Sequence, residues 1–196
     1  MPEAPLFEAP TGELAVVVAV QSALVHRTGV LPMTRGMSHF GEHSIGWLVA
    51  SLLGAILVPC RRRDWLVAGA GTFVAHGVAV LIKRMVQRTR PSHPAIAVNF
   101  DVPTQLSFPS AHVTSTTAAA ILIGRASGLT KTIAAAVLVA PMVLSRIALG
   151  VHYPSDVAFD VVLSAAIAGT TARFESWLLR KWPTHSGPST AGGAAK

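Results

Sequence analysis

The sequence predicts an all-α protein, a polytopic transmembrane helix bundle of about five spans with one more helix at the membrane interface. Of its 196 residues, 51% are hydrophobic and only 13% are charged, whereas about 25% of the residues in an ordinary soluble domain are charged. Mean hydropathy is positive, at +0.52. Since so few charged residues cannot supply the polar surface of a soluble fold, the chain is predicted to be integral to a membrane.

Five apolar stretches are long enough to approach the roughly 20 residues that cross a bilayer as a helix. These candidate spans are residues 45–60, 65–82, 109–124, 132–150 and 154–179. A sixth apolar run, residues 14–25, has only 12 residues and is followed by the helix breakers Gly29, Pro32 and Gly36. It is therefore predicted to lie in the membrane interface rather than to span.

Basic residues between the spans predict the orientation of the chain. Arg61 to Arg63, Arg125 with Lys131, and Arg180 with Lys181 all fall on one side, which the positive-inside rule assigns to the cytoplasm of a plasma membrane. The C-terminus is then cytoplasmic, and residues 83–107 and 146–156 face the extracytoplasmic side. The net charge of +7 does not indicate a nucleic-acid partner, because the basic residues form short clusters between apolar runs.

One basic cluster lies on the predicted outer face and exceeds what orientation requires. Lys83 and Arg90 are seven residues apart, about two helical turns, so on a helix they share one face. Pro91 is expected to end that helix. Two readings stay open, an anion site or basic side chains that extend to the interface. For Arg84 and Arg88 the same alternatives hold, contact with a substrate or orientation of the helix end.

Two further motifs fall on the same face. Pro109-Ser110-Ala111-His112 stands before an apolar run, and a helix start that carries a hydroxyl and an imidazole can bind an anion and donate a proton. Ser145-Arg146 is followed after five residues by His152 and after three more by Asp156. A carboxylate close to an imidazole can orient it as a nucleophile toward phosphorus.

The three motifs together resemble those of the type 2 phosphatidic acid phosphatase (PAP2) superfamily of membrane lipid phosphatases. The resemblance extends from about Ser38 to Leu179 and matches the family's motif spacings. It departs at Ala111, where family members usually have glycine, which leaves open how the extra methyl group affects the approach of phosphate. On this basis residues 1–37 are an N-terminal interfacial segment, 38–182 a PAP2-like membrane catalytic domain and 183–196 a disordered tail.

The resemblance implies a phosphatase that needs neither metal nor cofactor and acts through a phosphohistidine. It implies that His152 attacks phosphorus, that Asp156 orients His152, and that His112 protonates the leaving oxygen and then activates water. Phosphate-binding roles are implied for Lys83, Arg90, Ser110 and Arg146. The implied partners are membrane lipids and a lipid-linked phosphate substrate. The sequence does not indicate an oligomeric state.

The motifs recognise phosphate but not the rest of the lipid. A polyprenyl-linked sugar phosphate, undecaprenyl pyrophosphate and phosphatidylglycerophosphate all stay open as substrates. A non-catalytic lipid-phosphate binder or transporter is the alternative from another class, although binding alone would not require two histidines and an aspartate. His39 and His43 have a spacing that can bind a metal, but no third ligand is evident. Asp160 lies inside the last span, so it is expected either to support the active-site turn or to pair with His76.

Overall fold

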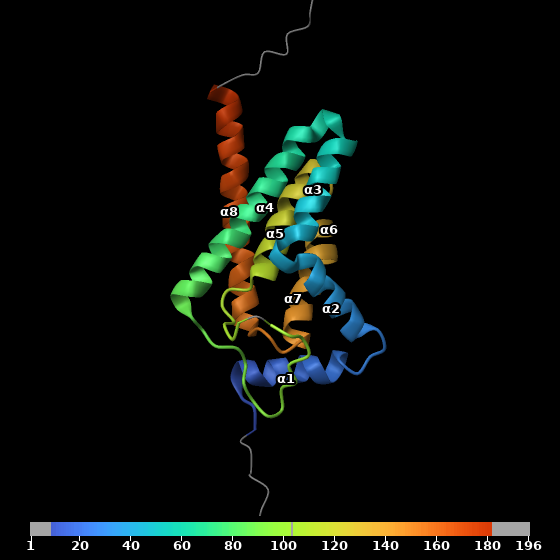
Figure 1. The fold of residues 1–196 in the computed structure, drawn as a ribbon, viewed down its shortest axis with the longest axis vertical. Helices are drawn as coiled ribbons and strands as arrows, with labels where there is room; N and C mark the ends of the chain where they lie inside the picture. Colours follow the sequence, from blue (N-terminus) through green and yellow to red (C-terminus); the bar gives the residue numbers. More distant parts are fainter. Residues whose placement is uncertain (1–8, 103, 182–196) are drawn as a thin grey trace, which may run out of the picture.

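The computed structural model describes residues 9–102 and 104–181, and the elements in these ranges are all helices (Figure 1). The predicted tail, residues 183–196, lies outside the described residues. The α-helices are α1 (Gly12–Leu24), α2 (Val30–Gly41), α3 (Ile45–Leu57), α4 (Arg62–Val86), α5 (Ala111–Ser127), α6 (Lys131–Ala134), α7 (Ala140–Ala148) and α8 (Pro154–Lys181). Short 3-10 turns, Glu42–Ser44 and Pro59–Arg61, join α2 to α3 and α3 to α4, and a π-helical turn, Ala135–Val139, joins α6 to α7.

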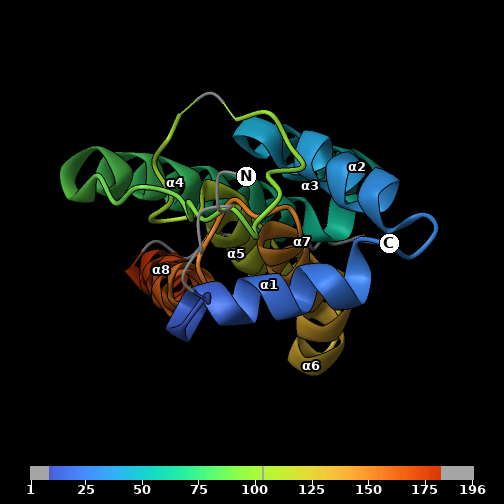
Figure 2. The ribbon, with the colours of Figure 1, turned by 90° about the horizontal axis from the view of Figure 1, so that it is seen from below.

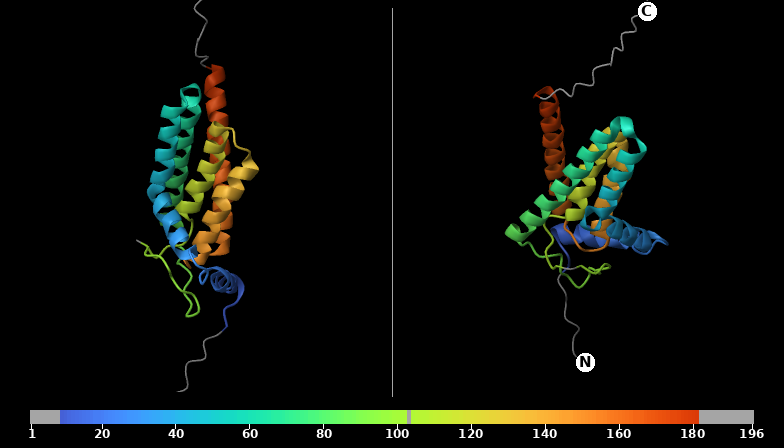
Figure 3. Two further views of the ribbon diagram at one scale, coloured as in Figure 1. Left: turned by 90° about the vertical axis from the view of Figure 1, so that its right-hand side faces the viewer. Right: turned by 45° about the horizontal axis from the view of Figure 1, so that its top comes forward.

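Helix α5 lies in the middle of the bundle and packs against both α4 and α8 (Figures 1 and 3). All of its positions from Val113 to Ala120 are buried, and all but Val113 are alanine, serine or threonine. Small side chains let helix backbones approach closely, which is how helices commonly pack inside a membrane.

Large apolar side chains cover the outer faces of α3, α4 and α8. They are exposed rather than packed in the core, and they include Val49, Leu53, Ile56, Phe73, Leu81, Val162 and Phe174. A water-soluble protein rarely exposes so much apolar surface, whereas in a bilayer these side chains contact lipid. The predicted class, a helical membrane bundle, is confirmed.

Three helical stretches are long and apolar enough to cross a membrane: Val30–Leu57, Pro59–Val86 and Pro154–Lys181. Thr132–Ala148 is apolar but shorter. Helix α5 has 17 residues and is surrounded by its neighbours, so its serines and threonines do not have to face lipid. The predicted number of five spans stays a prediction.

Helix α1 lies across one end of the bundle, nearly at right angles to the long helices (Figure 1). Seen from that end, α1 and the segment between α4 and α5 lie over the bundle (Figure 2). Gln21 holds α1 in this position through its side-chain amide. The amide nitrogen donates to the backbone oxygen of Ala97 at 2.6 Å and to that of Ala148 at 3.1 Å. The amide oxygen accepts from the backbone N–H of Ala97 at 3.1 Å. That this helix lies in the membrane interface stays a prediction.

Helix α2 was not predicted, because Pro32 and Gly36 were interpreted as breakers. Pro32 lies in the first turn of α2, where a residue without an N–H loses no bond within the helix. The fourth predicted span also differs, since it contains the π-helical turn just before Pro141 and ends at Ala148 rather than Gly150. Gly150 has a positive φ of 73°, which ends the helix and begins the turn that carries His152.

Candidate active site

A cavity of about 1040 Å³ is lined by residues of several helices and the loops that join them. Its lining comes from α2, the turn Glu42–Ser44, α4, α5, α7, the segment before α5 and the turn before α8. Five of the seven predicted site residues line it together: Lys83, Arg90, His112, Arg146 and His152. The two others, Ser110 and Asp156, are fully buried and are not among the lining residues.

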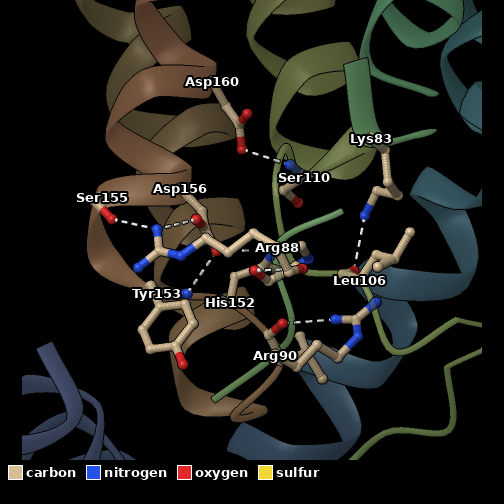
Figure 4. Close-up of polar contacts among 12 residues, drawn as sticks. Lys83, Arg88, Arg90, Leu106, Ser110, His152, Tyr153, Ser155, Asp156 and Asp160 are labelled. Carbon is tan, nitrogen blue, oxygen red and sulfur yellow. Dashed lines mark hydrogen bonds and ion pairs between the residues drawn. The ribbon is translucent and has the colours of Figure 1, made fainter. Parts of the chain in front are cut away.

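Two cations enter the cavity from α4 and from the segment that follows it (Figure 4). The ammonium of Lys83 donates to the backbone oxygen of Leu106 at 3.1 Å, and Arg90 donates to the backbone oxygen of Val151 at 2.6 Å. The predicted helical face shared by Lys83 and Arg90 is wrong, because α4 ends at Val86. Arg90 nevertheless reaches the same cavity from extended chain. Burial lowers the pKa of Arg90 to about 10, so it stays protonated at neutral pH.

Arg146 supplies the third cation from the last turn of α7. Its side chain is 1% exposed, and its guanidinium donates to the hydroxyls of Ser38, on α2, and Ser145. Two neutral hydroxyls leave its charge uncompensated. A buried cation without a carboxylate partner is costly unless an anion arrives, so the end of the cavity that holds Lys83, Arg90 and Arg146 is suited to phosphate.

His152 is 3% exposed and lies in the turn between α7 and α8. Burial lowers the pKa of its imidazole, Asp156 raises it in part, and the nearby positive charges of Arg90, Lys83 and Arg146 lower it further, so the net shift is downward. The ring is therefore neutral at physiological pH. A neutral ring nitrogen has the free electron pair that a nucleophile needs.

Asp156 lies behind His152 on the first turn of α8. Its Oδ2 accepts from the backbone N–H of Tyr153 at 3.0 Å and is 3.8 Å from Nδ1 of His152. That separation is longer than a hydrogen bond and within the range of an ion pair. Since Nδ1 faces the carboxylate, Nε2 is the ring nitrogen left to attack phosphorus. Catalytic hydrogen bonds are often long without substrate and tighten when it binds.

His112 enters the cavity from the start of α5. Its Nε2 lies 3.0 Å from the backbone oxygen of Ser38, and because a carbonyl only accepts, Nε2 carries the hydrogen. Gly41 makes room for the ring, since a Cβ at Gly41 would lie 2.9 Å from Cδ2 of His112. His112 is thus held between α2 and α5 in the same cavity as His152.

Ser110 is not placed as the sequence motif predicts. Its backbone N–H, at the helix start where an anion site is predicted, donates to Asp160 at 2.9 Å (Figure 4). Its hydroxyl is buried and has no hydrogen-bond partner among the described residues. Asp160 therefore supports the start of α5. Among the described residues it makes no hydrogen bond to the active-site turn or to His76, the two alternatives that the sequence suggested.

Arg88 is placed differently from both of its predicted alternatives, since its guanidinium donates to Asp156 at 2.6 Å and to Glu13 at 2.7 Å. No local pattern indicates these contacts, because they join residues 68 and 75 positions apart. Ser38, the hydroxyl partner of Arg146, was also missed. Arg84, by contrast, lines the cavity.

The cavity is also lined by polar side chains other than the three cations and the two histidines. They include Arg35, Glu42, Asn99 and Asp101. His43 and Ser44, between α2 and α3, have positive φ values of 50° and 63°, a strained conformation that often occurs at functional sites. Carboxylate and amide groups together can hydrogen-bond the hydroxyls of a sugar.

The histidine, aspartate and clustered cations on a helical membrane bundle are those of a membrane phosphatase. A model of the PAP2 superfamily matches residues 64–180, more than half of the chain, and the chain belongs to this superfamily. The resemblance found in the sequence motifs is confirmed. The chain is accordingly a phosphoric monoester hydrolase.

Curated relatives within this superfamily have much of their sequence in common with the chain. The chain is 70% identical over 159 residues to the decaprenylphosphoryl-5-phosphoribose phosphatase of Mycobacterium tuberculosis (strain H37Rv), a match that covers 81% of the chain and 88% of the relative. It is 59% identical over 152 residues to the protein of the same name from Mycolicibacterium smegmatis, which covers 78% and 83%. The short segment from Gly36 to Gly41 also resembles this phosphatase.

Two solved structures share the fold. A PAP2 type phosphatidylglycerolphosphate phosphatase from Bacillus subtilis superposes with a TM-score of 0.65 at 18% identity, covering 84% of this chain and 86% of that one. LpxE from Aquifex aeolicus superposes with a TM-score of 0.61 at 17% identity, covering 85% and 98%. At these identities the likeness establishes the helical membrane fold alone.

Proposed function

We propose that the protein removes the 5-phosphate of decaprenylphosphoryl-5-phosphoribose at the extracytoplasmic face of the plasma membrane, as a step in the synthesis of cell-wall arabinan. One observation carries the proposal: three cations and two histidines from separate elements line a single cavity. The names of the relatives at 70% and 59% identity support the choice of lipid.

The first step is phosphoryl transfer to His152. The phosphate lies among Lys83, Arg90 and Arg146, which neutralise its oxygens and stabilise the transition state. Nε2 of His152 forms a bond to phosphorus as the P–O bond to the ribose breaks. For this step His112 carries a proton on each ring nitrogen: Nε2–H stays bonded to the Ser38 oxygen, and Nδ1 gives its proton to the leaving oxygen, so decaprenylphosphoryl-ribose leaves as an alcohol.

The second step regenerates the enzyme. His112, now neutral, takes a proton from a water molecule that attacks phosphorus, and the P–N bond to His152 breaks. Inorganic phosphate is released with His152 neutral and His112 protonated again. Asp156 stabilises the positive charge that the ring of His152 carries while it is phosphorylated.

The rest of the cavity supports a sugar between the two phosphates of this lipid. Glu42, Asn99 and Asp101 can accept or donate hydrogen bonds to ribose hydroxyls. Arg35 also lines the cavity and is suited to the phosphodiester that links ribose to the decaprenyl chain. Undecaprenyl pyrophosphate and phosphatidylglycerophosphate lack the ribose for which these groups are suited.

The test is phosphate release by purified protein in detergent or nanodiscs. We expect kcat/KM for decaprenylphosphoryl-5-phosphoribose to exceed that for undecaprenyl pyrophosphate and phosphatidylglycerophosphate by about 100-fold, the effect of two or three hydrogen bonds to the sugar. A higher rate on either competitor would overturn the proposed substrate. A folded protein that releases no phosphate from any of the three would favour the binder or transporter.

The same assay tests the charge arrangement. Because Lys83, Arg90 and Arg146 carry the positive charge that a metal ion supplies in other phosphatases, activity is expected to survive a chelator. Vanadate can adopt the five-coordinate geometry of the phosphoryl-transfer transition state. It is therefore expected to inhibit phosphate release. Loss of turnover in the chelator, with recovery on addition of a divalent ion, would contradict the proposed mechanism.

A further inference from the structure

Arg88 lies between α4 and α5, within the motif that runs from Lys83 to Arg90 but at none of its defining positions. One end of its guanidinium donates through Nη1 to Asp156 at 2.6 Å and to the hydroxyl of Ser155 at 2.8 Å (Figure 4). Its plane also lies over the ring of Tyr153, 4.1 Å from the centroid. Arg88 therefore contacts three of the four residues that follow His152, yet it is not among the residues that line the cavity.

Glu13, in the first turn of α1, completes this arrangement. It accepts from Nη2 of Arg88 at 2.7 Å through one oxygen and from the backbone N–H of Ser155 at 2.8 Å through the other. Burial raises the pKa of Glu13, but the hydrogen bonds from Ser155 and Arg88 outweigh it, so the pKa is lowered. Glu13 is thus ionised at neutral pH and holds the N-terminal helix to the turn that carries His152.

We infer that Glu13 and Arg88 are positioning residues that hold Asp156, and through it His152, in the geometry needed for attack on phosphorus. The inference rests on the proposed role of His152. Asp156 is fully buried, and Arg88 engages its Oδ1, which leaves Oδ2 for the backbone of Tyr153 and for Nδ1 of His152. Each carboxylate oxygen therefore has a separate function, and the direction in which Oδ2 points is set by Arg88.

Arg88 also balances the charge of Asp156. Among the charged groups that act on His152, Asp156 favours protonation of the ring, whereas Arg90, Lys83 and Arg146 oppose it. His112, when protonated, opposes it as well. Without Arg88 the negative charge of Asp156 would act more strongly on the ring. We therefore expect His152 to become protonated at a higher pH, so that it is inactive as a nucleophile over a wider pH range.

The experiment compares Arg88→Gln, Glu13→Gln and the double variant with the wild-type full-length protein, using decaprenylphosphoryl-5-phosphoribose and p-nitrophenyl phosphate. We expect Arg88→Gln to lower kcat by about 10- to 100-fold, a loss like that seen when residues that orient metal-bound histidines are replaced. KM should stay within about threefold of the wild-type value, because Arg88 does not line the cavity. Glu13→Gln should lower kcat less. The double variant should lose less than the product of the two single losses, since both act through one network.

The pH dependence separates positioning from general destabilisation. The acid limb of kcat/KM should move to higher pH in Arg88→Gln relative to wild type, a comparison in which ionisation of the substrate itself cancels. Arg27→Gln is the matched control, because Arg27 is an exposed arginine just beyond the other end of α1 whose side chain bonds to the backbone of Ala23. It should leave kcat and the pH profile unchanged.

Three results would overturn the inference: an unchanged kcat in Arg88→Gln, an acid limb that does not move, or independent effects of the two substitutions. If Arg88→Gln does not fold, Glu13→Gln provides the same test, since Glu13 is 37% exposed. His152→Ala distinguishes the two proposals. If His152→Ala retains turnover, the proposed function fails, whereas an inactive His152→Ala together with a fully active Arg88→Gln contradicts only the role of Arg88.

Discussion

His152 and His112 lie in one cavity, but their surroundings suit them to different tasks. His152 is buried among cations and kept neutral, whereas His112 is held by Ser38 and Gly41 at the start of α5. We expect His152→Ala to abolish turnover of every substrate, because no phosphoenzyme forms. His112→Ala should slow phosphoenzyme formation from the lipid by about 10²- to 10⁴-fold but much less from p-nitrophenyl phosphate, whose leaving group hardly needs a proton.

Single-turnover measurement of the phosphoenzyme checks this prediction. Steady-state rates are not sufficient, since His112 also activates water in the second step and both substrates would then turn over slowly. A phosphoenzyme in His152→Ala, together with its absence in His112→Ala, would reverse the two assignments.

Glu42 is the residue with which the sugar part of the cavity can be tested. Replacing it with glutamine keeps its shape and removes its charge, and a hydrogen bond to a charged group contributes about 1.5–3 kcal/mol. We expect Glu42→Gln to lower kcat/KM for decaprenylphosphoryl-5-phosphoribose by about 10- to 100-fold and to leave p-nitrophenyl phosphate unaffected. An equal loss on both substrates would show that Glu42 acts on the reaction itself and not on the ribose.

At the scale of elements, the approach of α2 to α5 determines where His112 lies. A methyl group at Gly41 would come within 2.9 Å of the His112 ring and 3.5 Å of Met142, so Gly41→Ala is expected to displace the imidazole. A displacement of about 1 Å can lower a rate by about 100-fold. We expect a fall in kcat of that order in Gly41→Ala, measured on the lipid substrate.

Gly36→Ala is the control on the same helix. A Cβ at Gly36 meets nothing within 4 Å, and alanine is favoured over glycine inside a helix by about 0.5–1 kcal/mol. This variant should be as active as wild type and slightly more stable in thermal unfolding. Equal activity of Gly41→Ala and Gly36→Ala would show that the ring of His112 is not confined by α2.

At the scale of the whole molecule, the two ends of the bundle differ. The cavity and α1 lie at one end, while the turn between α3 and α4, with the exposed Cys60, lies at the other (Figure 1). At that far end, buried Glu175 on α8 lies 2.8 Å from Arg125 on α5 and 3.5 Å from Arg63 on α4. The basic residues that predict the cytoplasmic side are therefore on the end opposite the proposed active site.

Cys60 makes this orientation testable. A membrane-impermeant thiol reagent should label Cys60 in inverted vesicles and not in intact cells. In a Cys60→Ser background, Thr28→Cys, at an exposed position next to α1, should be labelled in intact cells. The opposite pattern would place the active site inside the cell.

The sequence alone determined the class of protein and most of the residues proposed for the site. The scarcity of charge and the lengths of the apolar runs predicted a helical membrane bundle, because a bilayer imposes span length on each segment separately. The motifs identified Lys83, Arg90, His112, Arg146 and His152, since spacing within a short motif is a local property of the chain.

Only the tertiary structure decided how those residues are arranged in space and which other residues contact and support them. It placed α5 at the centre, ended α4 before Arg90, turned the N–H of Ser110 toward Asp160 and brought Glu13 and Arg88 to Asp156. These contacts join segments 50 to 75 residues apart. Such contacts depend on how whole helices pack against one another. The period of apolar residues along one helix shows which face of that helix is buried, but not which other helix covers that face.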